Sequence, residues 1–347
     1  MKIGFYNPYL DNPSGGERYT LALASHWSED HDVCLFWDDT SIIKKARERL
    51  NIDLSKTKIV QNVFRGKNVF KKISTSLQYD LIFFLSDGSI PTTLAKHNLL
   101  HFQVPFSEVA YSPFKLSRYQ YVVCNSRFTQ NHLDRRVRNK TIVIYPPVRP
   151  VPQEPKIKKD KIILSVGRFT GYHNVKKQEV MIDAFKKIEN HLSDWKLVLA
   201  GGLIESDRDY FRQLKDQSKN HRIELLSNFN FQELVKLYQQ APIYWHAAGF
   251  DETDPTLMEH FGISTVEAMS AGAMPIVFAG GGQTEVVEDG KNGFLWKTVE
   301  ELINNTLEVA GNMDNYEEVR QSAMKRSRDF SEEKFAQKFD ELLKQLQ

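Results

Sequence analysis

Short runs of apolar residues alternate along the chain with longer stretches in which apolar side chains recur every three or four positions. The short runs are continuous, which is typical of β-strands buried on both faces of a sheet. The longer stretches have helical spacing, as in 16–29, where Tyr19, Leu23 and Trp27 lie four positions apart. This alternation predicts a parallel, doubly wound α/β sheet. The strands expected in the first half are Lys2–Tyr6, Val33–Trp37, Lys58–Val63, Leu81–Leu85, Asn98–Phe102, Tyr121–Asn125 and Thr141–Tyr145.

A proline-rich segment interrupts the alternation near the middle of the chain. Residues 146–160 read PPVRPVPQEPKIKKD and hold five prolines. Because proline restricts φ and lacks a backbone donor, we expect a linker there. A second series of apolar runs follows, again alternating with helical stretches such as 178–191. Its members are Lys161–Val166, Trp195–Ala200, Ile223–Leu226, Pro242–Ala247, Met274–Ala279 and Gly293–Trp296.

The two series predict two domains. We expect Rossmann-like, doubly wound parallel-sheet domains over residues 1–150 and 151–330, facing each other across a cleft. Parallel sheets bind ligands at the carboxyl ends of their strands. Residues 331–347 carry Phe335 and Phe339 at helical spacing, so the chain is expected to close with an amphipathic helix that covers some other surface.

Composition narrows the class of protein. The 347 residues hold 46 Lys and Arg against 44 Asp and Glu, a net charge of +2, and 41% are hydrophobic. These values exclude disordered, collagen-like and disulfide-scaffold chains and argue against nucleic acid as the main partner. No apolar run approaches the roughly 20 residues that span a bilayer, and no signal peptide is expected. Cys34 and Cys124 lie in apolar runs, as buried thiols of a reducing compartment do. We therefore expect a cytoplasmic protein without a zinc site.

The first chemical motif is PSGGER at 13–18, which follows the first strand and opens a helix. The glycines Gly15 and Gly16 let the backbone approach a ligand closely, and a helix start offers unpaired N–H groups and the positive end of a dipole. An anion site is one interpretation. A plain tight turn before the helix is the other.

The second motif is the pair of cations that follows the first strand of the second domain. Arg168 comes directly after Gly167, and Lys176 and Lys177 stand where the next helix begins. An arginine fork and a lysine ammonium in the cleft would neutralise a diphosphate without a metal ion. Solvated surface cations are the alternative.

The third motif is EHFGISTVE, which places Glu259 and Glu267 eight positions apart. A carboxylate at a helix start that points into a cleft accepts hydrogen bonds from paired hydroxyls, as a ribose or hexose diol offers. The segment Ser264–Glu267 also fits a capping box with Ser264 as N-cap, in which case Glu267 only satisfies a backbone N–H.

The fourth motif is the glycine triplet 280–282, between an expected strand and a short helix. Its exposed amides suit phosphate oxygens or sugar hydroxyls. A glycine triplet alone is a weak signal, and its place after the carboxylate pair strengthens it.

Together these motifs resemble the retaining family 4 glycosyltransferases of the GT-B fold, over the whole chain. The resemblance is most specific in EHFGISTVEAMSAGAMPIV and the downstream GGGQTEVVEDGKNGFLW. It implies that Arg168 and Lys176 bind the donor diphosphate, that Glu259 contacts the donor sugar and that Glu267 contacts the ribose. It also implies that Gly15 and Gly16 approach the diphosphate and that Gly281 and Gly282 present amides to sugar or phosphate. The helix 331–347 would then pack back on the first domain.

Two further roles come from the same resemblance. Residues Ser227 to Phe229 would lie beside the nucleotide base. His101, at the end of an expected strand, would face the transferred sugar and orient it or the incoming hydroxyl. A core histidine with a satisfied ring is the alternative for His101. No residue is assigned as a base.

Other charged stretches carry less. Asp38–Asp39 and the acids of 251–254 are read as solvated loop acids, and His246 and His260 as too isolated to bind metal. The stretch 64–72 has Arg65, Lys67, Lys71 and Lys72, interleaved with Val63, Phe64, Val69 and Phe70. It suits an anionic membrane surface, and a solvated face is the alternative.

The function expected is transfer of a sugar, with retention, from a GDP- or UDP-linked donor to an acceptor hydroxyl of a glycan or lipid-linked glycan, with no bound cofactor or metal ion. The enzyme would lie in the cytoplasm, with peripheral contact at the inner face of the membrane through 64–72. A nucleotide-sugar 2-epimerase of similar fold and a catalytically silent nucleotide-sugar-binding protein are the alternatives.

Overall fold

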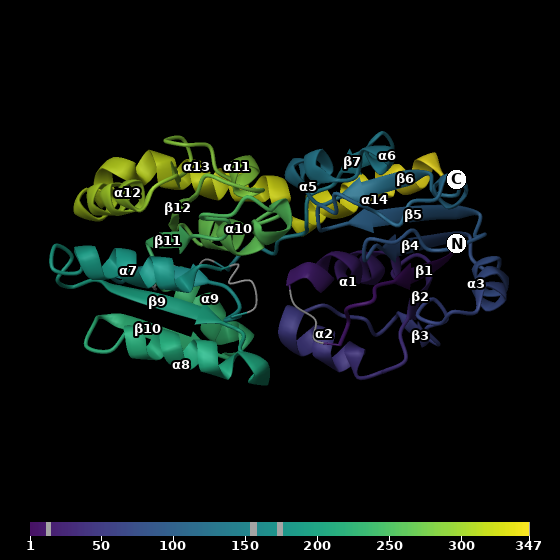
Figure 1. Cartoon of the computed structure of the whole chain (residues 1–347), viewed down its shortest axis with the longest axis horizontal. Coiled ribbons are helices and arrows are strands. Elements are labelled where there is room, and N and C mark those ends of the chain that lie inside the picture. Colours follow the sequence, from purple (N-terminus) through teal and green to yellow (C-terminus); the bar gives the residue numbers. More distant parts are fainter. Residues whose placement is uncertain (12–14, 153–157, 172–175, 347) are drawn as a thin grey trace. The chain divides into compact units, whose positions relative to one another are not determined.

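A computed structural model describes residues 1–11, 15–152, 158–171 and 176–346 (Figure 1). Pro13 and Ser14 of the first glycine motif and Pro155 of the expected linker lie outside these ranges. The chain divides into two compact units. Unit 1 holds residues 1–147 together with 332–347, and unit 2 holds residues 148–331.

Unit 1 is built on a parallel sheet of seven strands within the described residues, in the order β3-β2-β1-β4-β5-β6-β7. The registers Ile3↔Val33 and Ile3↔Leu81 place the first strand between β2 and β4. All of β4 is buried, as its unbroken apolar sequence LIFFL requires. The strands are β1 (Lys2–Tyr6), β2 (Asp32–Phe36), β3 (Lys58–Val60), β4 (Leu81–Leu85), β5 (His97–Phe102), β6 (Tyr121–Cys124) and β7 (Thr141–Val143).

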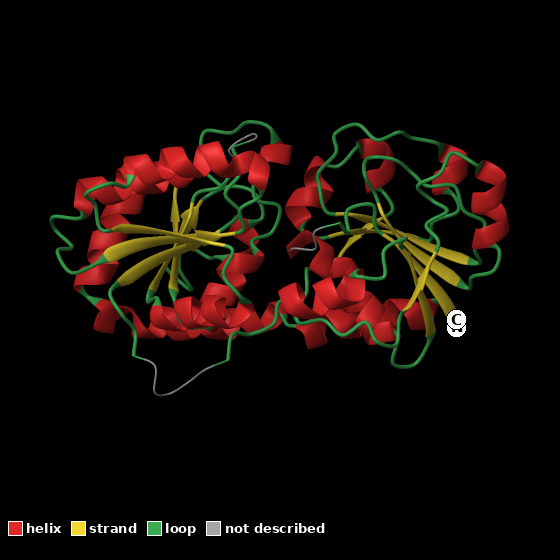
Figure 2. Ribbon diagram, turned by 90° about the horizontal axis from the view of Figure 1, so that it is seen from below, coloured by secondary structure: helices red, strands yellow, loops and turns green. Residues whose placement is uncertain are grey.

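Helices connect these strands and cover both faces of the sheet (Figure 2). Four of them begin at a side chain that caps a backbone N–H: Asn68 before α3, Ser112 before α4, Ser126 before α5 and Asp134 before α6. The helices of unit 1 are α1 (Gly15–Trp27), α2 (Ile42–Leu50), α3 (Val69–Ser76), α4 (Pro113–Leu116), α5 (Arg127–His132), α6 (Arg135–Arg138) and α14 (Glu332–Gln345).

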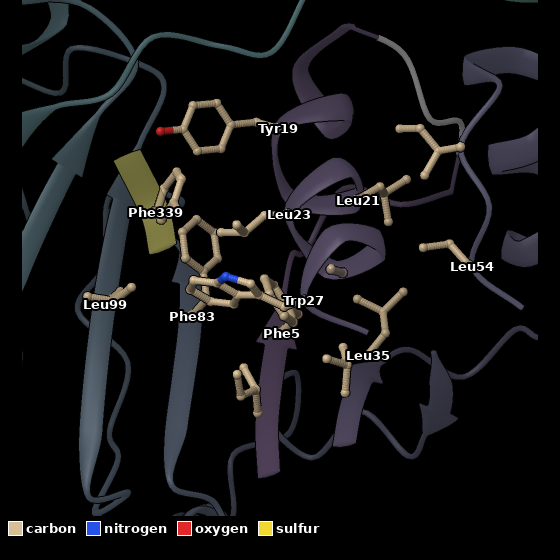
Figure 3. Close-up of a cluster of buried hydrophobic side chains, with 14 of the residues drawn as sticks. Phe5, Tyr19, Leu21, Leu23, Trp27, Leu35, Leu54, Phe83, Leu99 and Phe339 are labelled. Carbon is tan, nitrogen blue, oxygen red and sulfur yellow. The ribbon is translucent and has the colours of Figure 1, made fainter. Parts of the chain in front are cut away.

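The last helix, α14, completes the core of unit 1. The fully buried Phe339 meets the rings of Tyr19 and Trp27 edge-on at 5.9 Å each (Figure 3). Trp27 Nε1 also donates to Asp340 at 3.0 Å. Phe5 and Phe83, on β1 and β4, extend the same aromatic cluster. The final helix therefore packs against α1 and the first strands of the chain.

Unit 2 repeats the design on a parallel sheet, with described strands in the order β10-β9-β8-β11-β12-β13. Its core packs Trp245 and Trp296 with Phe185. The strands are β8 (Ile162–Val166), β9 (Lys196–Gly201), β10 (Ile223–Ser227), β11 (Ile243–His246), β12 (Met274–Phe278) and β13 (Phe294–Trp296). The α-helices are α7 (Gln178–Ile188), α8 (Arg208–Gln217), α9 (Phe231–Gln240), α10 (Ile263–Ser270), α11 (Gln283–Val286), α12 (Val299–Gly311) and α13 (Glu317–Ser327). The 3-10 helices are η1 (Glu205–Asp207), η2 (Pro255–Leu257), η3 (Met313–Tyr316) and η4 (Arg328–Phe330).

Each unit is a Rossmann-like α/β domain, so the fold class predicted from the sequence is confirmed. The unit boundary falls between Pro147 and Val148. Every expected strand is present with ends shifted by three residues at most, the largest shift being at β3, which ends at Val60 instead of Val63.

Candidate active site

The candidate site of unit 2 lies at the carboxyl ends of β8, β9 and β11. Directly after β8, the chain stays paired with the end of β9, because Gly167 N–H donates to Ala200 and Phe169 N–H donates to Gly202, both at 2.9 Å. A Cβ on Gly201 would stand 1.9 Å from the Gly167 carbonyl oxygen. Only glycine permits that approach, which holds the Gly167–Phe169 segment over the sheet edge.

The two predicted cations are placed on this segment and beside it. Arg168 is exposed, and its guanidinium forms no ion pair with any described residue. The aliphatic stem of Lys176 lies over Gly167, where a Cβ would meet its Cδ at 3.2 Å. Gln178 Nε2 donates to the Arg168 carbonyl at 3.0 Å and ties the start of α7 to the same segment. Lys176 is therefore next to Arg168 in space, eight positions away in sequence.

Glu259 joins this group through its carboxylate. Its Oε2 accepts from Lys176 Nζ at 2.7 Å and from His246 Nε2 at 3.0 Å. The Glu259 side chain is 16% exposed. Burial alone raises the pKa of Glu259, but the Lys176 ammonium and His246 outweigh it and hold the pKa well below its usual range. The carboxylate is thus charged at neutral pH, and within the described residues its Oε1 is left for a ligand.

His246 is a member of the site that the sequence analysis dismissed. It ends β11 and is 3% exposed. Because Nε2 donates to a carboxylate, the bare nitrogen is Nδ1, which is buried and has no partner in the described part of unit 2. Burial lowers the pKa of His246, although the charge of Glu259 opposes this. A lone histidine at the end of the apolar run IYWH gives no sign of a carboxylate thirteen positions away.

The second carboxylate, Glu267, lies on α10. The alternative in which Ser264 is the N-cap of a capping box is wrong: α10 begins at Ile263, its N-cap is Gly262 with φ 109°, and no described side chain caps the helix. Ser264 is therefore already inside the first turn. Glu267 Oε2 accepts from the Tyr238 hydroxyl of α9 at 2.9 Å.

Tyr244, on β11, contacts the first turn of α10. Its hydroxyl donates to Ser264 Oγ at 2.8 Å. Burial raises the pKa of Tyr244, and the charges of Glu259 and Glu267 both add to that rise. The two glutamates predicted from their spacing are therefore near the same phenol, which the sequence alone did not single out.

The glycine turn packs against the backbone of Glu259. Gly281 has φ 62°, and a Cβ there would lie 2.2 Å from the Glu259 carbonyl oxygen. A Cβ on Gly282 would lie 2.3 Å from the His260 carbonyl oxygen. The Gly282 N–H already donates to Glu259 O at 2.7 Å, so in this structure it is not presented to a ligand. The Gly281 N–H donates to no described group. The turn thus positions the Glu259 segment as well as offering one amide.

The predicted base-binding residues follow β10. Ser227 ends that strand, paired with Gly201 of β9, and Phe229 is half-buried two positions later. Between them Asn228 adopts φ 56° and its side-chain amide exchanges two hydrogen bonds with the Leu203 backbone, at 2.9 and 3.0 Å. This shapes a fixed turn beside the end of β9, at the same sheet edge as Arg168.

The other predicted site residues, Gly15, Gly16 and His101, belong to unit 1. Gly15 and Gly16 open α1 at the exposed end of the helix. A Cβ on Gly16 would meet the Gln103 amide nitrogen at 3.3 Å.

His101 has no exposed surface. Its ring stacks on Tyr19 with centroids 3.9 Å apart, and Nδ1–H donates to the Val123 carbonyl at 3.0 Å. Burial lowers the pKa of His101 to about 3, so the ring is neutral at physiological pH. His101 is a core residue as placed here, and its role toward a sugar stays a prediction.

Two cavities mark the edges of the unit 2 sheet. One of about 10 Å³, enough for a single water, is lined by Lys176 and His246 at the carboxyl edge. Another, open and about 670 Å³, lies at the amino edge among the ends of β8, β9 and β10. Charged side chains that line this cavity pair with each other, as Lys196 and Glu224 do at 2.9 Å. We therefore place the candidate active site at the carboxyl edge.

Glu252 is only 18% exposed and lies in an ion pair, so the expectation of a solvated loop acid is wrong for this residue. Glu252 accepts from Lys177 at 2.6 Å, and Asp254 caps the short helix η2. Asp39 accepts from Ser41 in its own turn. Over residues 1–11, 15–152, 158–171 and 176–346, no cluster of three or more His, Cys, Asp and Glu side chains is arranged to hold a metal ion.

Residues 150–326, just over half of the chain, match the family model described as "Glycosyl transferases group 1". The chain belongs to this family. Among curated proteins, this group 1 glycosyltransferase is similar to GDP-Man:Man(3)GlcNAc(2)-PP-Dol alpha-1,2-mannosyltransferase of Dictyostelium discoideum, with 28% identity over 246 residues, 65% of this chain and 47% of that protein. It is also similar to Alpha-1,3/1,6-mannosyltransferase ALG2 of the same organism, with 28% identity over 209 residues, 55% of this chain and 47% of that protein. The chain spans about half the length of these relatives.

Solved structures resemble this chain over nearly its whole length. A glycosyltransferase from Rickettsia africae superposes with TM-score 0.79 at 18% identity, covering 99% of this chain and 98% of that one. Anabaena HepE in complex with UDP and glucose gives 0.74 at 20% identity, covering 99% and 100%. At these identities the likeness concerns the fold, which is that of the GT-B glycosyltransferases. Among the described helices, none combines the length and the apolar character that crossing a membrane demands.

Proposed function

We propose that this glycosyltransferase moves a sugar from a nucleotide diphosphate sugar to an acceptor hydroxyl with retention of configuration and without a metal ion, as the resemblance to family 4 implies. The observation that carries the proposal is the Lys176–Glu259–His246 group beside the unpaired guanidinium of Arg168. It places two cations and a charged carboxylate at the carboxyl edge of one parallel sheet, where such sheets bind ligands.

The leaving group explains the need for the two cations. When the bond between sugar C1 and the phosphate oxygen breaks, its electron pair stays on the diphosphate. Arg168 offers a bidentate fork to that charge. Lys176 has three N–H donors and uses one on Glu259, which leaves two for phosphate oxygens. The Gly281 amide adds a further donor in this proposal.

The carboxylates serve the sugar and the ribose. Glu259 is held by Lys176 and His246 through Oε2, so Oε1 is the atom we assign to a donor-sugar hydroxyl. Glu267 is assigned to the ribose diol and the turn at Ser227–Phe229 to the base. The acceptor oxygen attacks C1 on the face that the diphosphate leaves, and its proton passes to the departing phosphate oxygen, so no protein base is needed. We keep Gly15 and Gly16 as proposed donor contacts from unit 1. His101 is fully buried, so its proposed sugar contact requires that the ring become exposed.

The donor and acceptor follow from the relatives. Two of the similar proteins are named as mannosyltransferases, one of them with GDP-Man as donor and a glycan on PP-Dol as acceptor. We therefore propose GDP-mannose as the first donor to test and a lipid-linked glycan as the acceptor class. UDP-glucose is the second donor, since HepE is described with it. The buried free thiols of Cys34 and Cys124 fit action in the reducing cytoplasm.

The central experiment compares Arg168→Ala with Arg208→Ala, an exposed arginine on α8 of the same unit. Loss of one group that stabilises transition-state charge costs about 10²–10³ in turnover. We expect that loss for Arg168→Ala with an unchanged melting temperature, and near-parental turnover for the control. Normal turnover in Arg168→Ala would refute its role. Turnover that vanishes with EDTA and returns with Mg²⁺ would contradict metal independence.

Two measurements separate the alternatives. Donor incubated without acceptor and analysed for a C2 epimer tests the 2-epimerase. Thermal shifts with GDP, UDP, ADP and their sugars test donor identity, since a ligand at 100 times its Kd stabilises by about 2.7 kcal/mol. Binding without transfer or hydrolysis of any donor would favour the silent binding protein.

A further inference from the structure

Two phenylalanines of unit 1 lie on the surface with most of their rings in water. Phe70 on α3 is 87% exposed, and Phe114 on α4 is 75% exposed. On α3, Val69 is 49% exposed, and Leu77, the residue directly after the helix, is 63% exposed. These four are most of the large hydrophobic side chains that the described residues leave open to solvent. Their gathering on two short helices marks an interaction surface.

The residues around these side chains are basic. Segment 61–79 contains four cations and no carboxylate, and segment 109–120 contains two cations and no carboxylate. Lys67, Lys71, Lys72 and Lys115 form no ion pair with any described residue. Lys71 Nζ donates instead to the Gln61 side chain at 2.9 Å. The positive charge of these helices is therefore open to a ligand.

The segments next to the two helices pack in one core cluster, which holds Leu116 of α4 together with Val63, Phe64 and Tyr79 from either side of α3. Burial lowers the pKa of Lys72, and the charge of Lys115 on the other helix lowers it further. Asp87 acts on Lys72 in the opposite direction and is the carboxylate that faces it. Lys72 follows Phe70 by two positions and Lys115 follows Phe114 directly. Each phenylalanine is thus accompanied by a lysine, and the two lysines repel each other until an anionic group lies between them.

The structure also corrects the extent of this surface. The whole stretch 64–72 was predicted to contact a membrane, but Phe64 is buried against Phe36 at 4.8 Å and Phe84 at 4.9 Å. Arg65 lies over the Trp37 ring at 5.3 Å and pairs with Asp11 at 3.8 Å, so its charge already has partners within the unit. The surface begins beyond these residues and gains α4, which lies more than forty positions later in the sequence.

We propose that this phenylalanine–lysine surface, formed by Lys67, Val69, Phe70, Lys71, Lys72, Leu77, Phe114 and Lys115, binds the anionic face of a lipid bilayer. Exposed rings enter the boundary between headgroups and acyl chains, while the lysines contact lipid phosphates. A soluble anion would satisfy the lysines and leave the rings in water, and a second copy of this chain would bring the same positive charge to the interface. Only an anionic apolar layer matches both features of the surface.

The test measures binding of the full chain to sedimented vesicles without donor or acceptor, so its failure leaves the proposed reaction untouched. The vesicles are pure phosphatidylcholine or an equimolar mixture with phosphatidylglycerol. We expect binding to the anionic vesicles only. Phe70→Ser with Phe114→Ser should lower the partition coefficient by about tenfold per ring, and Lys71→Gln with Lys115→Gln by about fivefold per charge.

Matched controls come from elsewhere on the surface. Ile204→Ser changes a side chain of unit 2 that is 60% exposed, and Lys44→Gln removes an exposed charge of α2. Both should bind as the parent does, and all variants should keep the parental melting temperature. Equal binding of the parent and the phenylalanine double variant would overturn the proposal. So would salt-resistant binding to pure phosphatidylcholine, or a parental dimer in sedimentation velocity that the double variant abolishes.

Discussion

Replacing His101 by Gln tests whether this residue is a core group or a sugar contact. In the structure the ring is fully buried between Tyr19 and the Val123 carbonyl, and burial lowers its pKa from 6.5 to about 3. As the pH falls below 6.5 the unfolded chain takes up a proton at this position and the folded chain does not. Stability therefore falls with pH through the window from 6.5 down to about 3.

The size of this effect follows from the two pKa values. At about pH 4.5 the proton uptake of the unfolded chain costs the folded state about 2–3 kcal/mol, and the full shift would amount to about 5 kcal/mol. The Gln variant loses the ring stacking at every pH but does not titrate. The difference in unfolding free energy between parent and variant should therefore shrink by about 2–3 kcal/mol from about pH 7.5 to about pH 4.5.

Urea unfolding at several pH values measures that difference, with His132→Gln, which removes an exposed histidine of the same unit, as the control. Proton NMR gives a second readout, because the imidazole signal that is missing in the His101 variant can be followed in the parent. A signal that titrates near pH 6.5, together with a pH-independent difference in stability, would mean that the ring is open to water. The core placement would then be wrong and contact with a sugar would regain its support.

Three further predictions concern packing and the site. Gly282→Ala places a Cβ 2.3 Å from the His260 carbonyl oxygen and should lower the free energy of unfolding, measured by thermal unfolding, by about 3 kcal/mol. In the control Gly311→Ala the new Cβ has nothing within 4 Å, and the free energy of unfolding should rise by about 0.5 kcal/mol. Equal effects of the two substitutions would contradict the close approach at Gly282. Phe339→Ala should cost about 3–5 kcal/mol, and a cost no larger than that of truncating the exposed rings of α3 or α4 would argue against a core role. His246→Asn should lower kcat about tenfold in the parent but not in a Glu259→Gln background; an effect of equal size in both backgrounds would show that His246 does not act through that carboxylate.

The strands were predictable because most are short, mainly apolar runs such as LIFFL in β4, and in parallel sheets covered on both faces that pattern has few other meanings. The end of β3 was misjudged for the same reason. Val63 and Phe64 are apolar and buried, but they reach the core from a loop after Val60 rather than as part of the strand. An apolar residue is predicted to be buried, but its type does not show whether its backbone still forms hydrogen bonds with a neighbouring strand.

The site was predictable as a set of residue types and much less as a set of contacts. Lys176 and Glu259 are 83 positions apart and share a hydrogen bond, and no local pattern encodes that pairing. The capping box with Ser264 as N-cap is not formed because Gly262 takes a left-handed φ and α10 begins two residues earlier. Glycine permits this conformation, but a glycine in the sequence does not by itself predict it. His246 was missed because its meaning depends on a carboxylate delivered by the following loop.

The position of α14 bears on how the protein is made. Unit 1 lacks one of its core helices until residues 332–345 have left the ribosome, whereas every segment of unit 2 has by then been synthesised. We expect unit 2 to reach its native state first during translation. Until then the sheet of unit 1 lacks one of its covering helices, and the aromatic side chains around Trp27 stay uncovered. Nascent chains stalled before α14 should therefore be the species that chaperones bind most avidly.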